Sequence, residues 1–419
     1  MTDPVAHFTA VAARHRRCFW LDGGGAREWS GRRSIIGWLD DDDVSITYDA
    51  ARREVTRHAG GRAEVVGDDV FAVLEEALAA DAEAGQGHAQ WFGYFGYASR
   101  PDLPASPCGR MPDAVWMRAR HVRLFEHDEA VEARPRETGP TGVEPMPIPH
   151  EYAAAFDRVQ EHLHAGNSYE VNLTYRLEAL SDLPPAAAYL RLRELNPAPY
   201  AGFLQHDVDD HRAWLLSSSP ERYALITADR ALETKPIKGT TPRGSTPDQD
   251  AVLRFRLLTE PKFRAENLMI VDLLRNDLSM VCEPGTVQVP ALMEGESYET
   301  VHQLVSTVRG HLADGVSTMT ALRTLFPAGS MTGAPKLRTM QIIDEVESTP
   351  RGAYAGAFGW VSGDGRADLG VVIRSLMTGG DGRWQLGTGG GITVHSDLAE
   401  EYAESRWKAE RLLRVFAQN

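Results

Sequence analysis

The chain has 419 residues, 42% of them hydrophobic and 25% charged, which is typical of a globular protein with one large domain or two ordinary ones. Its net charge of −15 at pH 7 argues against nucleic acid or an anionic membrane surface as a partner. The three cysteines lack CxxC spacing, no apolar run reaches membrane-spanning length and the start, MTDPVAHFTA, lacks a signal pattern, so we expect a cytoplasmic protein without a disulfide framework.

Prolines divide the sequence into two regions. Prolines 135, 140, 145, 147 and 149 disfavour both helix and central strand, so we predict a linker over 134–150. The region before it is predicted to be mostly strands, among them GRRSIIGW and AQWFGYFGYASR, with one clear helix over 69–84.

The region after the linker mixes helices and strands without regular alternation, which predicts an α+β fold. We expect a half-buried strand in SYEVNLTYRLEAL, a strand pair around the Ser-Pro turn of AWLLSSSPERYALIT, and a hairpin that turns at 363–365. Helices are predicted in EYAAAFDRVQEHLHAG, AENLMIVDLLRNDL, GAPKLRTMQIIDEVE and DLAEEYAESRWKAERLLRVF. The second of these is apolar nearly all round, so we expect it to be buried.

Several acidic residues on these helices are candidates for a metal site. Glu266 lies on the helix predicted to be buried, where a carboxylate needs a partner such as a metal ion. Alternatively, it is a structural glutamate near the start of the helix, stabilised by the positive end of the helix dipole. Glu401, Glu404 and Lys408 share one face of the last helix, which by itself also fits a solvated charged face. Two glutamates from separate helices would suit Mg²⁺, which binds one or two carboxylates together with substrate oxygens and waters.

Cationic and glycine-rich stretches suggest an anion site. The glycines of LGTGGGI, directly before the last helix, leave backbone N–H groups bare. Arg374 in VVIRSL lies among apolar residues of a predicted strand. An arginine there either forms a structural ion pair or binds an anion. Lys238 in TKPIKGTTP fits the mouth of a pocket, although most such lysines are exposed loop residues.

Together these stretches resemble the chorismate-utilising enzymes, the family that includes the large components of anthranilate synthase and aminodeoxychorismate synthase. The resemblance covers nearly the whole chain, in family order. It rests on GRRSIIG, WFGYFGY, PDAVWMR, SYEVNLTYR, NPAPYAGFL, SSSPERY, KPIKGT, AENLMIVDLLRNDL, LVSTVRG, FPAGSMTGAPK, IRSL and GGGI…EEYAESRWK.

The resemblance implies a large, mainly antiparallel β-sandwich core with helices packed outside. It also implies a strand-rich N-terminal region of the anthranilate synthase component I type over 1–133, the linker over 134–150, and a chorismate-binding catalytic region over 151–419.

Lys238 separates subgroups of this family, because anthranilate synthases typically have alanine there. The resemblance implies covalent catalysis, in which the neutral amine attacks ring carbon 2 of chorismate as the 4-hydroxyl leaves, and ammonia then adds at carbon 4 and expels the lysine. We therefore expect burial or nearby positive charge to lower the pKa of Lys238. The product would be 4-amino-4-deoxychorismate, used in para-aminobenzoate and folate biosynthesis.

Other positions take their implied roles from the same resemblance. Glu221 would protonate the departing hydroxyl, which requires a pKa raised by burial. Mg²⁺ would be held by Glu266 and Glu404, with Glu401 close by. The implied substrate-binding groups are Thr240 and Thr332 in the pocket wall, and Arg374, Lys408 and the backbone of Gly389, Gly390 and Gly391 around a carboxylate.

The ammonia would come from a separate glutamine amidotransferase subunit or from solution, because Cys18, Cys108 and Cys282 have no glycine-rich nucleophile elbow. The stretch FWLDGGG (19–25) lacks the Glu-Ser pair of the tryptophan-binding loop in regulated relatives, so tryptophan inhibition is not expected.

Two departures from the family pattern leave alternatives open. Gln303 stands where the family usually has histidine, and His302, one residue earlier on a strand, would face the other way. His395 is a second departure. A catalytically silent subunit that binds chorismate or a partner therefore remains an alternative, as does an anthranilate synthase or another chorismate aminase or hydroxylase.

Overall fold

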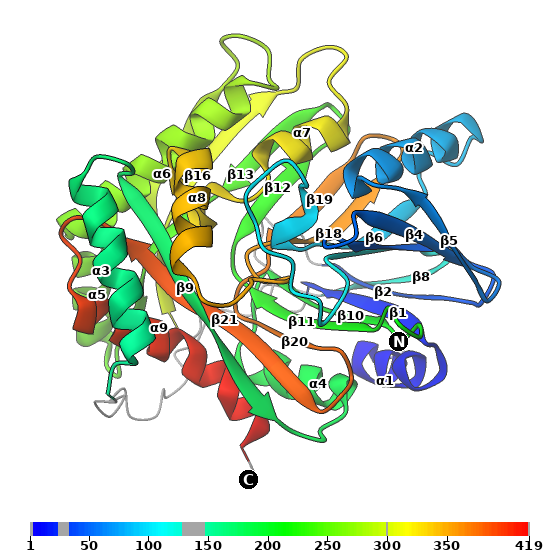
Figure 1. Cartoon of the computed structure of the whole chain (residues 1–419), viewed down its shortest axis with the longest axis horizontal. Helices are drawn as coiled ribbons and strands as arrows, with labels where there is room; N and C mark the ends of the chain where they lie inside the picture. The colour runs from blue at the N-terminus through cyan, green and yellow to red at the C-terminus, as the bar shows by residue number, and fades with distance from the viewer. Residues whose placement is uncertain (1–2, 24–32, 128–146, 299–300, 418–419) are drawn as a thin grey trace.

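The computed structural model describes residues 3–23, 33–127, 147–298 and 301–417 (Figure 1). Most of the predicted linker, and the last two residues of FWLDGGG, lie outside the described residues. Within the described part, two large antiparallel sheets and the surrounding helices form the α+β architecture expected from the sequence.

The first sheet, sheet A, contains nine strands. In spatial order they are β17 (Gly333–Ala334), β9 (Glu170–Leu180), β21 (Arg383–Ile392), β20 (Ser375–Thr378), β11 (Ala213–Ser219), β10 (Tyr200–His206), β1 (Arg17–Asp22), β2 (Arg33–Leu39) and β8 (His121–Glu126).

The second sheet, sheet B, contains twelve strands. In spatial order they are β14 (Ile237–Pro242), β16 (Val301–His311), β13 (Ala231–Lys235), β12 (Arg222–Ile226), β19 (Ala367–Val371), β18 (Ala357–Ser362), β6 (Gln90–Phe95), β7 (Ala114–Arg118), β3 (Ser45–Asp49), β4 (Glu54–Ala59) and β5 (Arg62–Gly67), with β15 (Gln288–Ser297) paired to β16.

Side chains from both sheets meet in one hydrophobic core, which makes the pair a β-sandwich. Phe19 of β1 stacks on Phe92 of β6 with ring centroids 3.8 Å apart. The next residue, Trp20, points to the opposite face of sheet A, where it packs among helix residues such as Phe8 and Tyr189. This alternation follows from the two-residue period of a strand, so both faces of sheet A are covered.

The regions before and after the Pro-rich segment both contribute to each sheet. In sheet A, β1 pairs with β10, and in sheet B, β6 pairs with β18. Strands far apart in sequence therefore lie side by side at the centre of both sheets.

Helices cover the outside of the sandwich (Figure 1). They are α1 (Pro4–Arg14), α2 (Val70–Glu83), α3 (His150–His164), α4 (Pro185–Leu195), α5 (Pro247–Thr259), α6 (Pro261–Ser279), α7 (Thr318–Leu325), α8 (Lys336–Val346) and α9 (Leu398–Leu413), with 3-10 turns η3 (Tyr97–Ser99), η4 (Gly329–Met331) and η5 (Arg414–Phe416). Among the described helices, none is long and apolar enough to cross a membrane.

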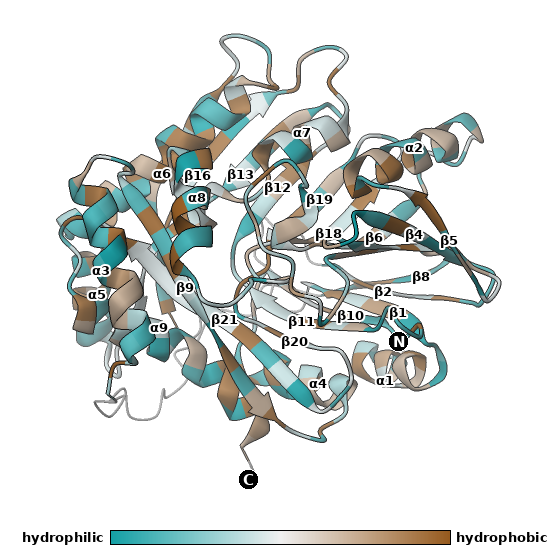
Figure 2. Ribbon diagram, viewed as in Figure 1, coloured by the Kyte–Doolittle hydropathy of each residue, from teal (hydrophilic) through white to brown (hydrophobic). Residues whose placement is uncertain are grey.

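The predicted helices and the hairpin at 363–365 are confirmed, and Asp397 caps α9 by accepting hydrogen bonds from two backbone amides. Three expectations were wrong. The N-terminal region contains a second helix, α1. The strands on either side of Pro220, β11 and β12, belong to different sheets. Finally, α6 is not buried all round, since Leu268 is exposed. Figure 2 shows both hydrophilic and hydrophobic residues along this helix.

A buried carboxylate links β9 to the end of α8. Glu347 accepts hydrogen bonds from Arg351 at 2.6 Å and from Arg176 at 3.0 Å, and all three side chains are at most 4% exposed. It also accepts from the amide of Thr174 at 2.9 Å. Arg176 in turn lies over the ring of Tyr354. Because two guanidinium groups depend on one carboxylate, loss of its charge would leave them uncompensated in the interior.

We therefore expect Glu347→Gln to lower the free energy of unfolding by about 3–5 kcal/mol, the usual cost of breaking a buried ion pair from one side. Glu345→Gln is the matched control, because Glu345 is 44% exposed and its ion pair with Arg158 should contribute at most about 1 kcal/mol. Urea unfolding of both variants measures the difference. Equal midpoints for the two variants would contradict the prediction.

Candidate active site

A cavity lies where the chain passes between the two sheets. Glu221 follows Pro220 at the crossing from β11 of sheet A to β12 of sheet B. Arg374 lies at the return crossing, from β19 to β20, and both side chains line the cavity. The sequence analysis placed Arg374 within a strand, and this prediction was wrong. The φ of Arg374 is +51°, which is unusual for a residue other than glycine. Its carbonyl accepts a hydrogen bond from the amide of Ser218, which fixes this turn.

A β-bulge directs Lys238 into the cavity. Ile237 and Thr240 of β14 pair with Val305 and Gln303 of β16, so two residues of β14 lie opposite one residue of β16. The second bulged residue, Gly239, has φ of +93°, and a Cβ there would lie 2.9 Å from the Phe263 ring. Glycine therefore makes this bulge possible, and the bulge turns the preceding lysine inward.

Lys238 is 7% exposed and surrounded by carboxylates. It forms an ion pair with Glu170 of β9, which is 1% exposed. Burial alone would lower the pKa of Lys238, but the carboxylates of Glu170, Glu266 and Glu221 raise it above its ordinary value. The expectation of a lowered pKa was therefore wrong for the protein without substrate. The lysine is buried as predicted, but its neighbours are negative rather than positive.

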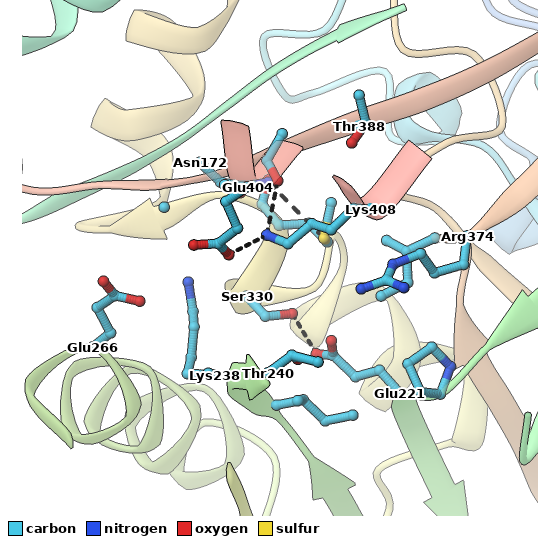
Figure 3. A pocket seen from close by; sticks show the side chains of 18 of the residues that line it. Asn172, Glu221, Lys238, Thr240, Glu266, Ser330, Arg374, Thr388, Glu404 and Lys408 are labelled. Atoms are coloured by element: carbon cyan, nitrogen blue, oxygen red, sulfur yellow. Dashed lines mark hydrogen bonds and ion pairs between the residues drawn. The ribbon is translucent and has the colours of Figure 1, made fainter. Parts of the chain in front are cut away.

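Glu221 has the properties that a proton donor requires. Its carboxyl is buried and accepts a hydrogen bond from Ser330 Oγ at 2.5 Å (Figure 3). Burial raises its pKa to about 7, although Ser330 and Lys238 oppose the shift. In a large fraction of the molecules this carboxyl is therefore protonated near neutral pH, as the predicted role of proton donor requires.

The three glutamates predicted to bind a metal all line the cavity, from two helices. Glu266 of α6 is buried, its Oε1 has no hydrogen-bond partner among the described residues, and burial raises its pKa to about 7. On α9, Glu401 accepts a hydrogen bond from Lys262 at 2.7 Å, and Glu404 pairs with Lys408 at 2.8 Å. Lys408 lowers the pKa of Glu404. Each of the α9 carboxylates is thus held by a lysine on the cavity wall.

The glycine-rich strand forms another wall. Gly389, Gly390 and Gly391 of β21 line the cavity beside Lys408, whose ammonium donates to the carbonyl of Gly389 at 3.0 Å. The guanidinium of Arg374 also lines the cavity and lies over the ring of Trp407, but it has no hydrogen bond or ion pair to any described residue, and burial lowers its pKa to about 10. In Figure 3 the side chains of Lys238, Glu404 and Arg374 face one common space. Cationic groups and bare backbone therefore line the same cavity as the carboxylates.

The structure brings together all but one of the predicted site residues. Those that line the cavity are Glu221, Lys238, Thr240, Glu266, Arg374, Gly389, Gly390, Gly391, Glu401, Glu404 and Lys408. Thr332 is the exception, because it is completely buried and its hydroxyl donates to carbonyls of its own turn, Ala328 and Gly329.

The neighbouring residues His302 and Gln303 take opposite faces of β16, as predicted. Gln303 lines the cavity, whereas His302 bonds to Ser297 and Asp250 outside it. His395 is exposed and does not line the cavity. No imidazole therefore replaces the usual histidine in this wall.

Sequence reasoning missed Glu170, Lys262 and Ser330. Glu170 lies on β9 between Tyr169 and Val171, where alternation assigns it to the polar face of a half-buried strand. In fact both faces of the first half of β9 are buried, and the polar face points to the site. The one sequence signal for Glu170 was its charge within a predicted strand, and burial of both faces of that strand became visible only in the structure.

A different cluster of possible metal ligands lies outside the cavity. Among the described residues, the ligand atoms of Asp40, Asp43 and His121 lie within 4.8 Å of one another. Arg120 and Arg17 already pair with Asp43 through its side chain and its carbonyl, respectively. Of the two aspartates, only Asp43 therefore has a carboxylate paired with an arginine, among the described residues.

Comparison with known proteins gives the family of this fold and cavity. The family model described as chorismate binding enzyme matches residues 16–414. Anthranilate synthase component I from Streptococcus pneumoniae TIGR4 has the same fold, with a TM-score of 0.74 and 25% identity over 91% of this chain and 92% of that chain. The chain therefore belongs to the chorismate binding enzymes.

Among curated relatives, the chain is 38% identical to an aminodeoxychorismate synthase of Streptomyces pristinaespiralis, over 99% of this chain and 64% of the relative. It is 43% identical to aminodeoxychorismate synthase component 1 of Klebsiella aerogenes, over 63% of this chain and 57% of the relative. The chain thus spans less than two thirds of the length of these relatives.

The raised pKa of Glu221 predicts a pH-dependent cost in stability. An unfolded glutamate ionises near its ordinary value of 4.5, whereas the folded protein keeps Glu221 neutral up to about pH 7. The cost of burying the carboxylate therefore develops between these two values and is complete above pH 7.

Glu221→Gln should accordingly melt about a few degrees higher than the wild type at pH 8.5, but show little difference at pH 4.5. Comparing the change in melting temperature at the two pH values isolates the effect of the charge, because every other effect of the amide substitution is the same at both. An equal change at the two pH values would contradict the assignment.

Proposed function

We propose that the protein aminates chorismate, with ammonia, to give 4-amino-4-deoxychorismate through a covalent bond to Lys238. The observation that carries this proposal is the bulge that turns Lys238 into a cavity lined by a buried acid and by anion-binding groups. The named relatives support the same reaction.

Lys238 and Glu221 divide the chemistry between a nucleophile and an acid. The neutral amine of Lys238 attacks ring carbon 2 as the 4-hydroxyl departs from the other end of the conjugated system. Glu221 gives its proton to that hydroxyl, which leaves as water. Ammonia then adds at carbon 4 and the bond to Lys238 breaks, so one difficult displacement becomes two easier ones.

Arg374 and its neighbours are suited to hold the carboxylate of the enolpyruvyl side chain. The guanidinium of Arg374 is partly buried and lies over the ring of Trp407, but it has no hydrogen bond or ion pair to a described residue, so an anion would supply the missing charged partner. Lys408 and the backbone of Gly389 to Gly391 complete this side of the cavity, and Thr240 lies beside Lys238.

Mg²⁺ fits the acidic side of the cavity. Glu266 has a buried carboxylate oxygen without a partner, and hard cations prefer carboxylate oxygen. Glu266 and Glu404 would hold the ion with Glu401 beside them. When bound, the ion would neutralise the ring carboxylate of chorismate, which otherwise meets several carboxylates of the protein.

A glutamine amidotransferase would supply the ammonia. The Klebsiella relative is named as component 1, which fits a second component. Burial raises the pKa of Cys18 and Cys282, and also that of Cys108, so none of these thiols is activated as a glutaminase nucleophile.

The test of the proposed function is incubation with chorismate, Mg²⁺ and an ammonium salt, with the product identified by mass. We expect 4-amino-4-deoxychorismate, and a mass increase on the peptide containing Lys238 when ammonia is withheld. Lys238→Ala should abolish the adduct and reduce product formation by more than about 100-fold. Anthranilate with release of pyruvate would instead identify the other amination course, and no turnover would favour a silent subunit.

Metal dependence is a separate prediction. A chelator should abolish turnover and added Mg²⁺ should restore it, and Glu404→Ala should lose most activity because it removes one side of the proposed site. Titration calorimetry on the protein without substrate should also show that the same variant binds Mg²⁺ more weakly than the wild type. Full activity in excess chelator would refute the metal site.

A further inference from the structure

The ion pair between Lys238 and Glu170 is the most constrained contact of the site. Lys238 lines the cavity, whereas Glu170 does not and contacts the ammonium from behind. The pair lies against β21, where a Cβ at Gly391 would be 2.2 Å from Glu170 Oε1 and 3.0 Å from Lys238 Nζ. Only a glycine at this position leaves room for the two side chains.

A nucleophilic lysine held as an ammonium ion must first lose a proton. The groups that face Lys238 are Glu170 of β9, Glu266 of α6 and Glu221 of the β11–β12 crossing. In the proposed reaction Glu221 gives a proton to the leaving hydroxyl, and Glu266 belongs to the metal side of the cavity. Glu170 is the carboxylate that remains, and among these three it is the one in hydrogen-bond contact with the ammonium.

We propose that Glu170 is the proton acceptor for Lys238, taking a proton from Nζ before the amine attacks chorismate and returning it when the amine is released. This inference rests on the proposed function. The second oxygen of Glu170, Oε2, is buried and has no hydrogen-bond partner among the described residues. Among the described residues, Lys238 is therefore the hydrogen-bond partner of the Glu170 carboxylate.

The medium favours this transfer once substrate fills the cavity. In water an ammonium and a carboxylate are each well solvated, but in a closed interior both charges lose that solvation. A neutral amine beside a neutral carboxylic acid avoids the cost. Substrate that excludes water would thus move the pair toward the reactive form.

The protons balance over the cycle. The pair changes from ammonium and carboxylate to amine and carboxylic acid. The lone pair of Nζ forms the bond to carbon 2, the ring double bond shifts, and the 4-hydroxyl leaves as water with the proton of Glu221. Ammonia then bonds to carbon 4 and the Nζ bond breaks. Glu170 returns its proton to the freed amine, and the new ammonium group of the product gives one proton to Glu221.

The test compares Glu170→Gln with the wild type in single-turnover experiments with chorismate and without ammonia, with the Lys238 adduct followed by mass. Glutamine keeps the shape and the hydrogen-bond acceptor but cannot take the proton. We expect adduct formation to slow by about 100-fold at pH 7, the usual range for loss of a general base. The rate in the variant should rise between pH 7 and pH 9, because solvent must then remove the proton.

The opposite result would overturn the proposal clearly. If Glu170 only holds Lys238 as a counter-ion, its removal leaves burial to lower the pKa of the lysine, and the adduct should form at the wild-type rate or faster. Glu170→Asp, which keeps a proton acceptor at a longer distance, should form the adduct faster than Glu170→Gln and show the pH profile of the wild type. This second variant also decides the question if the glutamine variant does not fold.

A matched control removes a similar ion pair elsewhere. Asp277 pairs with Lys336 at 2.6 Å in a buried position outside the cavity, so Asp277→Asn should lower stability but leave the adduct rate within about twofold of the wild type. An absence of any Lys238 adduct in the wild type would refute the proposed function itself. A normal adduct in Glu170→Gln would refute only the role of Glu170.

Discussion

The burial of Lys238 is the constraint on which the site depends. Its strand, β14, ends sheet B, and its partner Glu170 lies on β9, next to the end of sheet A. One ion pair thus joins the two sheets at the wall of the cavity. The buried charge of Lys238 is compensated first by Glu170 of the opposite sheet, and further by Glu266 of α6 and Glu221 of the crossing between the sheets.

The remaining charges follow from this arrangement. Carboxylates gather around the lysine and on the α6 side, while Arg374 and Lys408 lie toward β21 and the crossing between sheets. Charges of both signs therefore line one cavity, and the α9 glutamates are each paired with a lysine there. Two carboxyls, those of Glu221 and Glu266, are held with pKa values of about 7, which costs stability and makes proton exchange near neutral pH possible.

Local patterns were sufficient for most elements. The helix of 151–166 and the turn at 363–365 are properties of neighbouring residues, and each is present as predicted. Failures occurred where packing between distant strands decides the outcome. Pro220 marks a passage between sheets rather than a hairpin turn, and α6 has an exposed face that its many apolar residues concealed.

The sequence by itself determined the α+β class, the family resemblance and eleven of the twelve residues placed at the site, because these depend on residue types in recognisable order. Only the tertiary structure decided the electrostatic state of Lys238. The expectation of a lowered pKa considered burial and nearby positive charge, whereas Glu170 comes from a strand 68 positions earlier in the chain and reverses the balance. Electrostatic interaction depends on distance in space and on burial, and neither can be read from position along the chain.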